Sequence, residues 1–165
     1  KETDLEVIRK CQMIFQDPIA SLDPRMTVRD IIAEGLIING MKDKKEIDEK
    51  VFKMLEMVGL VKEHASRYPH EFSGGQKQRI GVARAIIMEP EIIIADEPTG
   101  NLDNETADGI MKLLTGINQE KGTAIVMVTH NRQIFEKYPG RVMVCKDETC
   151  TEQMPDEPID LDLTI

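Results

Sequence analysis

Two short apolar runs in the second half of the chain most constrain its fold. Residues 92–95 (Ile-Ile-Ile-Ala) and residues 124–128 (Ala-Ile-Val-Met-Val) lack polar side chains, which is typical of strands buried in a parallel sheet. Between them, apolar side chains recur at helical spacing, at Ile110, Leu113, Leu114 and Ile117. Two parallel strands joined by a helix form a right-handed crossover. The sequence therefore predicts an α/β fold built on a parallel sheet.

Polar side chains follow each predicted strand. Asp96 and Glu97 come directly after the first run, and Thr129 and His130 come directly after the second. Gln16 follows a third, shorter apolar stretch near the start of the chain. Ligands of open parallel sheets bind beyond the carboxyl ends of the strands. We therefore expect these side chains to converge at one edge of the sheet.

Carboxylates at such an edge suit phosphate chemistry. Asp96 can hold a Mg²⁺ ion, usually through water, and the ion neutralises phosphate oxygens. Glu97 can polarise an attacking water as a general base. His130 can contact a terminal phosphate or orient that water. The alternative is that the strand simply ends at a solvated edge of the sheet.

A glycine-rich turn opens the helix that precedes the first apolar run. Ser73 and Gln76 form the pattern of a capping box. Gly74 and Gly75 let the backbone approach a ligand closely. Because the amino-terminal end of a helix favours an anion, the turn is a candidate phosphate site. The alternative is an ordinary serine cap followed by a Gly-Gly turn.

The segment between the first strand and this turn is predicted to be helical. Thr27 and Asp30 form a second capping-box pattern, and apolar spacing predicts a further helix over residues 47–58. No strand pattern interrupts this part, so we expect an inserted helical subdomain at about residues 25–88. Near the end of the chain, residues 141–145 predict one more strand.

Acidic charge is concentrated at the carboxyl end of the 165-residue chain. The formal net charge is −9, and seven acids without any Lys or Arg follow Lys146, which leaves −2 for the rest. We expect one domain at residues 1–146 and a flexible tail at 147–165. The near-neutral body lacks the clustered Lys and Arg of a nucleic-acid surface, so no nucleic-acid partner is expected. Three cysteines, expected to be reduced, and the lack of a secretory signal favour the cytoplasm.

Together these motifs resemble those of ATP-binding-cassette (ABC) ATPases, over about residues 8–145. Five matches occur in the family's order: Gln16 with the Q-loop, residues 72–76 with the signature motif, residues 92–97 with the Walker B strand, residues 101–103 with the D-loop, and His130 with the switch histidine. The resemblance implies a parallel-sheet P-loop NTPase core of the RecA-like kind. The chain would hold its carboxyl-terminal part, with the helical subdomain inserted.

The resemblance further implies the ATPase subunit of an ABC transporter, with ATP and Mg²⁺ as cofactors. The residues implied to act are catalytic Glu97, His130 and Gln16, magnesium-binding Asp96 and Gln16, and nucleotide-contacting Ser73, Gly74, Gly75, Gln76 and Asp103. Two nucleotide-binding domains, identical or different, would dimerise head to tail. The helical subdomain and the Gln16 segment would contact transmembrane subunits at the cytoplasmic face of the cell membrane.

Different parts of the chain resemble different branches of the family. Residues 16–18, 21–28 and 31–34 look like those of oligopeptide and dipeptide importers. Residues 96–103, 128–131 and 138–142 look like those of lipoprotein-release, macrolide-export or cell-division systems. Peptide import is the leading prediction, and a lipoprotein-release or cell-division role is the first alternative. A soluble family member that acts on ribosomes or DNA, and an inert or regulatory piece, are alternatives from other classes.

The phosphate-loop pattern G-x-x-x-x-G-K-[ST] does not occur in this sequence, which begins at Lys1. We expect that loop to lie upstream, on a strand and a helix that precede Lys1. The 165-residue chain alone is then expected to bind ATP weakly or not at all and to show no steady-state hydrolysis, because phosphoryl transfer depends on positioning. Without the upstream strand and helix, apolar surface is expected to be bare.

Overall fold

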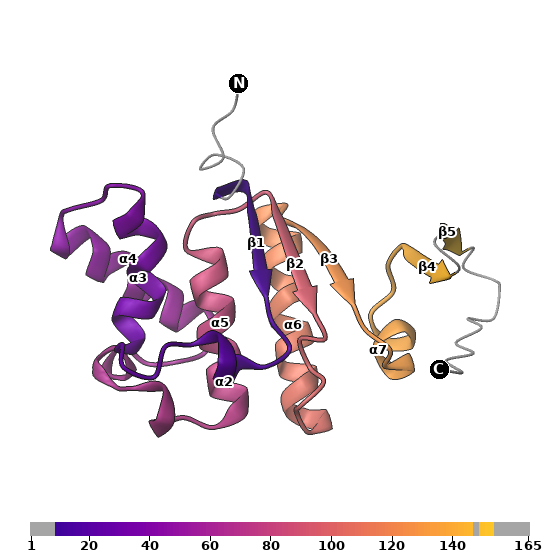
Figure 1. Cartoon of the computed structure of the whole chain (residues 1–165), viewed down its shortest axis with the longest axis horizontal. Helices are drawn as coiled ribbons and strands as arrows, with labels where there is room; N and C mark the ends of the chain where they lie inside the picture. The colour runs from indigo at the N-terminus through magenta and orange to yellow at the C-terminus, as the bar shows by residue number, and fades with distance from the viewer. Residues whose placement is uncertain (1–8, 147–148, 154–165) are drawn as a thin grey trace. The chain divides into compact units, whose positions relative to one another are not determined.

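The computed structural model describes residues 9–146 and 149–153 (Figure 1). Contacts between residues divide the chain into two compact units, Lys1–Thr129 and His130–Ile165. The first unit holds a parallel sheet and most of the helices. The second unit has a sheet of its own, which consists of two strands.

Three parallel strands form the sheet of the first unit: β1 (Cys11–Ile14), β2 (Ile92–Asp96) and β3 (Ala124–Val128). β2 is the central strand, hydrogen-bonded to β1 on one side and β3 on the other (Figure 1). Its Ile94 pairs with Met13 and with Val126. Helix α6 (Asn104–Lys121) connects β2 to β3. The predicted α/β fold with a parallel sheet is thus confirmed.

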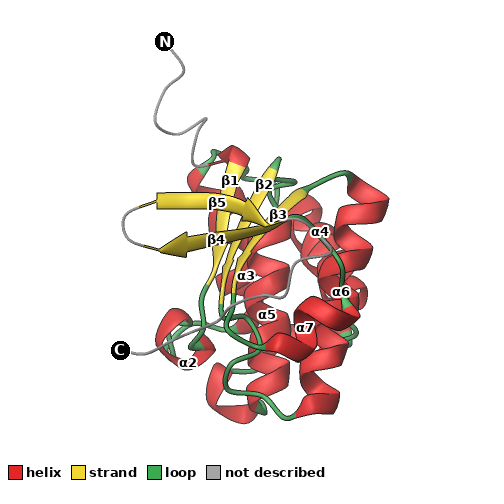
Figure 2. Ribbon diagram, turned by 90° about the vertical axis from the view of Figure 1, so that its right-hand side faces the viewer, coloured by secondary structure: helices red, strands yellow, loops and turns green. Residues whose placement is uncertain are grey.

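The two faces of this sheet differ in exposure. Ile14, Ile93 and Ala95 are at most 2% exposed and belong to the hydrophobic core. Helices α5 (Gly74–Ile86) and α6 contact the sheet and contribute to that core (Figure 2). Side chains of the alternate strand positions are apolar but open to solvent: Met13 is 39% exposed, Val126 is 55% exposed and Val128 is 57% exposed. The expected bare apolar surface is therefore present.

Every element between β1 and β2 is helical. In chain order these are α2 (Pro18–Ser21), α3 (Val28–Ile38), α4 (Lys44–Met57), the 3₁₀ helices η1 (Lys62–Ser66) and η2 (Pro69–Glu71), and α5. This agrees with the predicted helical insert, although its limits as a subdomain stay a prediction. Within the part of the chain that the structure describes, no helix is both long and apolar enough to cross a membrane.

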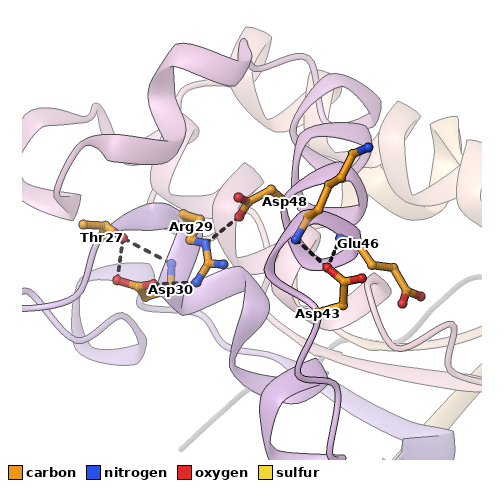
Figure 3. Close-up of polar contacts among 7 residues, drawn as sticks. Thr27, Arg29, Asp30, Asp43, Glu46 and Asp48 are labelled. Atoms are coloured by element: carbon orange, nitrogen blue, oxygen red, sulfur yellow. Dashed lines mark hydrogen bonds and ion pairs between the residues drawn. The ribbon is translucent and has the colours of Figure 1, made fainter.

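Side-chain caps set the beginnings of α3 and α4 (Figure 3). Thr27 Oγ1 accepts a hydrogen bond from the backbone N–H of Asp30 at 3.2 Å and donates to Asp30 Oδ2 at 2.7 Å, which confirms the predicted cap. Asp43 accepts from backbone N–H groups in the first turn of α4. Arg29 joins the two helices, because its Nε donates to Asp48 Oδ1 at 2.8 Å.

The second unit contains α7 (Arg132–Lys137), β4 (Val142–Lys146) and β5 (Thr149–Gln153). The strand predicted at residues 141–145 is β4, and it pairs antiparallel with β5. β5 places part of the predicted flexible tail in regular structure, because its backbone is hydrogen-bonded to β4. Residues 147–148 and 154–165, the rest of that tail, lie outside the described residues, so their flexibility stays a prediction.

Candidate functional site

The turn after β2 holds the two adjacent carboxylates. Asp96 is the last residue of the strand and is half-buried. The backbone N–H of Glu97 donates to the carbonyl of Val128 at 2.9 Å, which ties the start of the turn to β3. Glu97 has a φ angle of 42°, a left-handed conformation that costs a residue with a side chain about 1–2 kcal/mol. Strain of this kind is concentrated at functional sites.

Thr129 orients the Glu97 carboxylate. Its Oγ1 donates a hydrogen bond to Glu97 Oε2 at 3.1 Å, and both side chains are half-buried. The sequence placed Thr129 at this edge of the sheet but assigned it no role. The signal that could have found it is its position, since it directly follows β3 next to the end of β2.

Gln16 lies beside the same turn. A Cβ atom placed on Gly100 would come within 3.1 Å of Gln16 Nε2 and within 3.5 Å of Glu97 Cβ. The absence of that Cβ therefore leaves space for the Gln16 side chain. Helix α5 holds the backbone of the residue before Gln16, because the buried Gln78 side chain donates from Nε2 to the carbonyl of Phe15 at 3.3 Å. The structure thus brings Gln16, Glu97 and Thr129 to one edge of the sheet, as expected.

His130 begins the second unit. Its side chain is exposed, and the next residue, Asn131, caps α7 by accepting a hydrogen bond from the backbone N–H of Gln133 at 3.0 Å. The chain position of His130 directly after β3 is as predicted. Its action on a phosphate beside Glu97 stays a prediction.

Two side chains near the carboxylate turn carry oxygen atoms that could contact a magnesium ion. Among the described residues there is no group of three or more His, Cys, Asp or Glu side chains that could hold a metal. Asp96 offers a half-buried carboxylate, and Gln16 offers an exposed amide oxygen. Magnesium keeps several waters and binds through one or two carboxylates together with substrate phosphates. Asp96 and Gln16 therefore offer oxygens of the kind that magnesium binds, and their role as its ligands stays a prediction.

The glycine-rich turn begins α5 as the sequence predicted. Ser73 Oγ accepts from the backbone N–H of Gln76 at 3.3 Å, and Gln76 Oε1 accepts from the backbone N–H of Ser73 at 3.1 Å. This reciprocal pair is a capping box. Ser73 and Gly74 are exposed, so the positive end of the helix faces solvent.

Gly75 has a packing role that the sequence did not reveal. A Cβ atom at this position would overlap Cγ2 of Thr106, in the first turn of α6. At Gly74 the nearest atom to such a Cβ would be Leu102 Cδ2 at 3.7 Å, an ordinary contact. The beginnings of α5 and α6 therefore lie side by side, and Gly75 allows their close approach.

Asp103 is the cap of α6. Its Oδ1 accepts from the backbone N–H of Thr106 at 2.9 Å, and its Oδ2 accepts from Thr106 Oγ1 at 2.6 Å. These hydrogen bonds from Thr106 lower the pKa of Asp103 below its ordinary value, because they stabilise the ionised carboxylate. The predicted contact of Asp103 with a nucleotide stays a prediction beside this structural role.

Two arginines of α5 were missed by the sequence reasoning. Arg79 Nη1 donates to the carbonyl of Val58 at 2.7 Å, so it binds the carboxyl end of α4. Arg84 Nη1 donates to the carbonyl of Ser21 at 2.6 Å. Burial lowers the pKa of Arg84, against the opposing effect of the Glu34 charge. Both arginines occur in a helix with an apolar stripe, a pattern that gave no sign of their distant backbone partners.

Arg84 also lines a hollow of about 400 Å³ beside α2. Leu22, Ile31 and Glu34 line it as well, so its wall combines apolar surface with both signs of charge. The hollow lies in the helical part of the first unit, apart from the carboxylate turn. It belongs to the surface that the sequence predicted to contact transmembrane subunits, and that contact stays a prediction.

Comparison with known families and proteins shows consistent similarities. The family model described as "ABC transporter" matches residues 2–100. The oligopeptide transport ATP-binding protein OppF of Bacillus subtilis (strain 168) is 53% identical over 141 residues, which are 85% of this chain and 46% of that protein. The chain therefore spans about half the length of the curated relatives that it matches.

Solved structures agree with the sequence comparison. The structure of cbiO1 from Clostridium perfringens, part of the ABC transporter complex cbiONQ, aligns with a TM-score of 0.78 at 31% identity and covers 89% of this chain and 57% of that one. A dimeric post-hydrolysis state of the ATP-binding cassette MJ0796, bound to ADP and phosphate, aligns with a TM-score of 0.66 at 33% identity. That alignment covers 80% of this chain and 59% of the solved chain.

Proposed function

Since the chain belongs to the ABC transporter family, we propose that it is part of an ATP-hydrolysing subunit that drives the import of oligopeptides. The observation that carries the proposal is the turn after β2, where Thr129 orients the Glu97 carboxylate next to Asp96. The names of the relatives, oligopeptide transport ATP-binding proteins, support the substrate class.

In this proposal each residue that follows a strand has its own role in ATP hydrolysis. Glu97 accepts the proton of the attacking water, and the Thr129 hydroxyl holds its carboxylate in place. Asp96 and Gln16 are the side chains that would hold Mg²⁺, in part through water. Bound magnesium neutralises the phosphate oxygens of ATP. His130 contacts the terminal phosphate or orients the water.

The glycine-rich turn serves a second site in this proposal. The exposed capping box and the amino-terminal end of α5 face an ATP held by a second nucleotide-binding domain. The similarity to a cassette solved as a dimer with ADP and phosphate supports this arrangement.

The helical part couples the site to a membrane partner in this proposal. α5 is bonded to the chain on both sides of the Gln16 segment, through Gln78 to Phe15 and through Arg84 to Ser21. Transmembrane subunits are proposed to contact α2 and α3, which places the protein at the cytoplasmic face of the membrane. The presence of a relative in a transporter complex, cbiONQ, supports such a partner.

One specific observation favours a second candidate, a lipoprotein-release or cell-division role. Residues 96–103 read Asp-Glu-Pro-Thr-Gly-Asn-Leu-Asp, which resembles those branches. Capture of the membrane subunits by the full-length protein distinguishes the two candidates, because importer-type and release-type subunits differ. Recovery with ribosomes or DNA, without membrane subunits, would contradict both candidates.

The activity is tested on the protein at the full length of its relatives. We expect magnesium-dependent ATP hydrolysis, and a loss of roughly 10²–10⁴-fold in Glu97→Gln, which keeps the shape but removes the general base. Glu105→Gln, an exposed change in the first turn of α6, is the matched control and should leave the rate unchanged. Hydrolysis at the wild-type rate in Glu97→Gln would falsify the assigned role.

The 165-residue chain alone provides a separate test. The sequence contains no G-x-x-x-x-G-K-[ST] phosphate loop, so this chain should show no steady-state ATP hydrolysis. Steady turnover by the purified chain, abolished by Glu97→Gln, would contradict that expectation.

A further inference from the structure

Two cysteines face each other across the hairpin of the second unit. Cys145 on β4 and Cys150 on β5 are directly opposed in the antiparallel register. Their sulfur atoms are 2.7 Å apart, and both side chains are exposed. Opposed residues in antiparallel strands have Cα atoms about 4.5–5.5 Å apart. That separation lies within the range of about 4.4–6.8 Å that a disulfide requires.

The alignment of the two sulfurs has an independent support. Arg141 Nε donates to Glu152 Oε1 at 2.9 Å, and Arg141 Nη2 donates to Glu152 Oε2 at 3.0 Å. A two-point pair of this kind between an arginine and a carboxylate fixes geometry as well as charge. It lies on the same hairpin, so the register that opposes the cysteines does not depend on the sulfur contact.

A metal site is the main alternative use of two neighbouring thiols. Structural zinc takes four protein ligands. In residues 9–146 and 149–153 no group of three or more His, Cys, Asp or Glu side chains is placed to hold a metal. The third cysteine, Cys11, lies on β1 in the other unit. The two sulfurs are therefore better placed to react with each other.

We propose that Cys145 and Cys150 form a reversible disulfide by exchange with low-molecular-weight disulfides such as oxidised glutathione. One cysteine thiolate attacks a glutathione sulfur, the disulfide bond of glutathione breaks, and one glutathione thiolate leaves. The second cysteine then attacks the protein sulfur of the mixed disulfide and expels the second glutathione. The two cysteines lose two electrons and two protons, and one oxidised glutathione becomes two reduced molecules.

The two sulfurs share a hydrogen bond in which either thiol can be the donor. The hydrogen bond with Cys145 raises the pKa of the Cys150 thiol, because it stabilises the protonated form. The thiolate is the attacking species, and whichever cysteine attacks the oxidant first, the other closes the ring. Exposure of both side chains gives glutathione access to either sulfur.

The test uses the purified chain, oxidised glutathione, acid quenching and mass spectrometry. We expect the loss of two free thiols, a mass lower by two hydrogen atoms, and full reversal by dithiothreitol. Trypsin cuts after Lys146, between the two cysteines, so a cross-linked pair of tryptic peptides identifies the bond. Disulfide-linked dimers, or glutathione on both cysteines without ring closure, would overturn the proposal.

Three variants locate the reaction. Cys150→Ser should stop with one glutathione on Cys145, and Cys145→Ser should stop with one glutathione on Cys150. Cys11→Ser should close the ring as the wild type does, and a failure of this variant to close would contradict the pairing. The share of ring-closed product should fall in denaturant, where the hairpin register is lost. An unchanged share would show that nearness in sequence, and not the hairpin, brings the sulfurs together.

Discussion

The turn after β2 and the turn that opens α5 are fixed in different ways. At the first, Glu97 takes a left-handed backbone conformation, and its carboxylate is held by Thr129. At the second, Gly75 lies so close to Thr106 that no Cβ would fit. The first turn orients a reactive side chain, whereas the second brings two helix ends together. A motif glycine can thus be required by packing within its own chain, whatever ligand its backbone also binds.

The largest expected effect of a substitution on stability is at the glycine-rich turn. Gly75→Ala should lower the free energy of unfolding by about 1–3 kcal/mol, because the added methyl overlaps Thr106 Cγ2. Urea unfolding of the purified chain measures the change. Gly74→Ala is the matched control, and it should be neutral or slightly stabilising, because its Cβ makes an ordinary contact.

A second variant tests the cause of that loss. Thr106→Ser removes the overlapping methyl but keeps the hydroxyl that donates to Asp103. The double variant Gly75→Ala with Thr106→Ser should therefore recover most of the lost stability. If Gly75→Ala proves as stable as Gly74→Ala, the close approach of α5 and α6 is not what requires glycine.

The next effect concerns backbone strain at the carboxylate turn. Glu97→Ala and Glu97→Gly both remove the bond to Thr129, but only glycine relieves the positive φ angle. Glu97→Gly should therefore be more stable than Glu97→Ala by about 1 kcal/mol. The same two substitutions at Glu49, an exposed position inside α4, should have the opposite effect: the alanine variant should be more stable than the glycine variant by a similar amount. Chemical denaturation of the four variants decides the matter.

A smaller effect is expected at Thr129. Thr129→Val keeps the shape but removes the donor to Glu97, so the free energy of unfolding should fall by roughly 0.5–1 kcal/mol. In the full-length protein the rate of ATP hydrolysis should fall as well, because the carboxylate is no longer oriented. Thr129→Ser retains the hydroxyl and should keep both properties near the wild-type values. Equal rates of ATP hydrolysis in the valine and serine variants would show that the Thr129 hydroxyl has no role in catalysis.

The smallest effect is the pH dependence of the α6 cap. The hydrogen bonds from Thr106 lower the folded pKa of Asp103, so its contribution to stability is present above the unfolded pKa and is lost as pH falls through the folded pKa. Asp103→Asn keeps a capping oxygen without titrating. Its urea midpoint should therefore fall less than that of the wild type between neutral pH and about pH 3. Parallel acid dependence in both proteins would exclude a measurable contribution of Asp103.

Sequence reasoning succeeded where the signal is local. The side-chain cap at Thr27 and the capping box at Ser73 are set by residues three positions apart, and the strand–helix–strand unit is set by the period of apolar side chains. These features depend on the sequence immediately around them. The convergence of Gln16 and Glu97 followed from one general rule on parallel sheets.

The features that were missed depend on contacts between distant segments. The fit of Gly75 against Thr106 and the bond of Arg79 to Val58 join residues that lie in different helices. The pairing of β4 with β5 was missed because the seven acids of the tail indicated disorder. In the structure the two strands are matched by two opposed cysteines and by an ion pair between Arg141 and Glu152. Amino-acid composition describes the average polarity of such a segment, whereas the stability of a hairpin depends on a few directly opposed pairs of side chains.

The open apolar face of the parallel sheet has a thermodynamic consequence. Met13, Val126 and Val128 remain largely hydrated in the folded chain, so unfolding exposes less new apolar surface than the chain length implies. The heat capacity of unfolding rises with newly exposed apolar area, and the urea m-value rises with all the area exposed. The chain should therefore show a heat-capacity change below about 12–15 cal/mol/K per residue and a shallow dependence of stability on temperature.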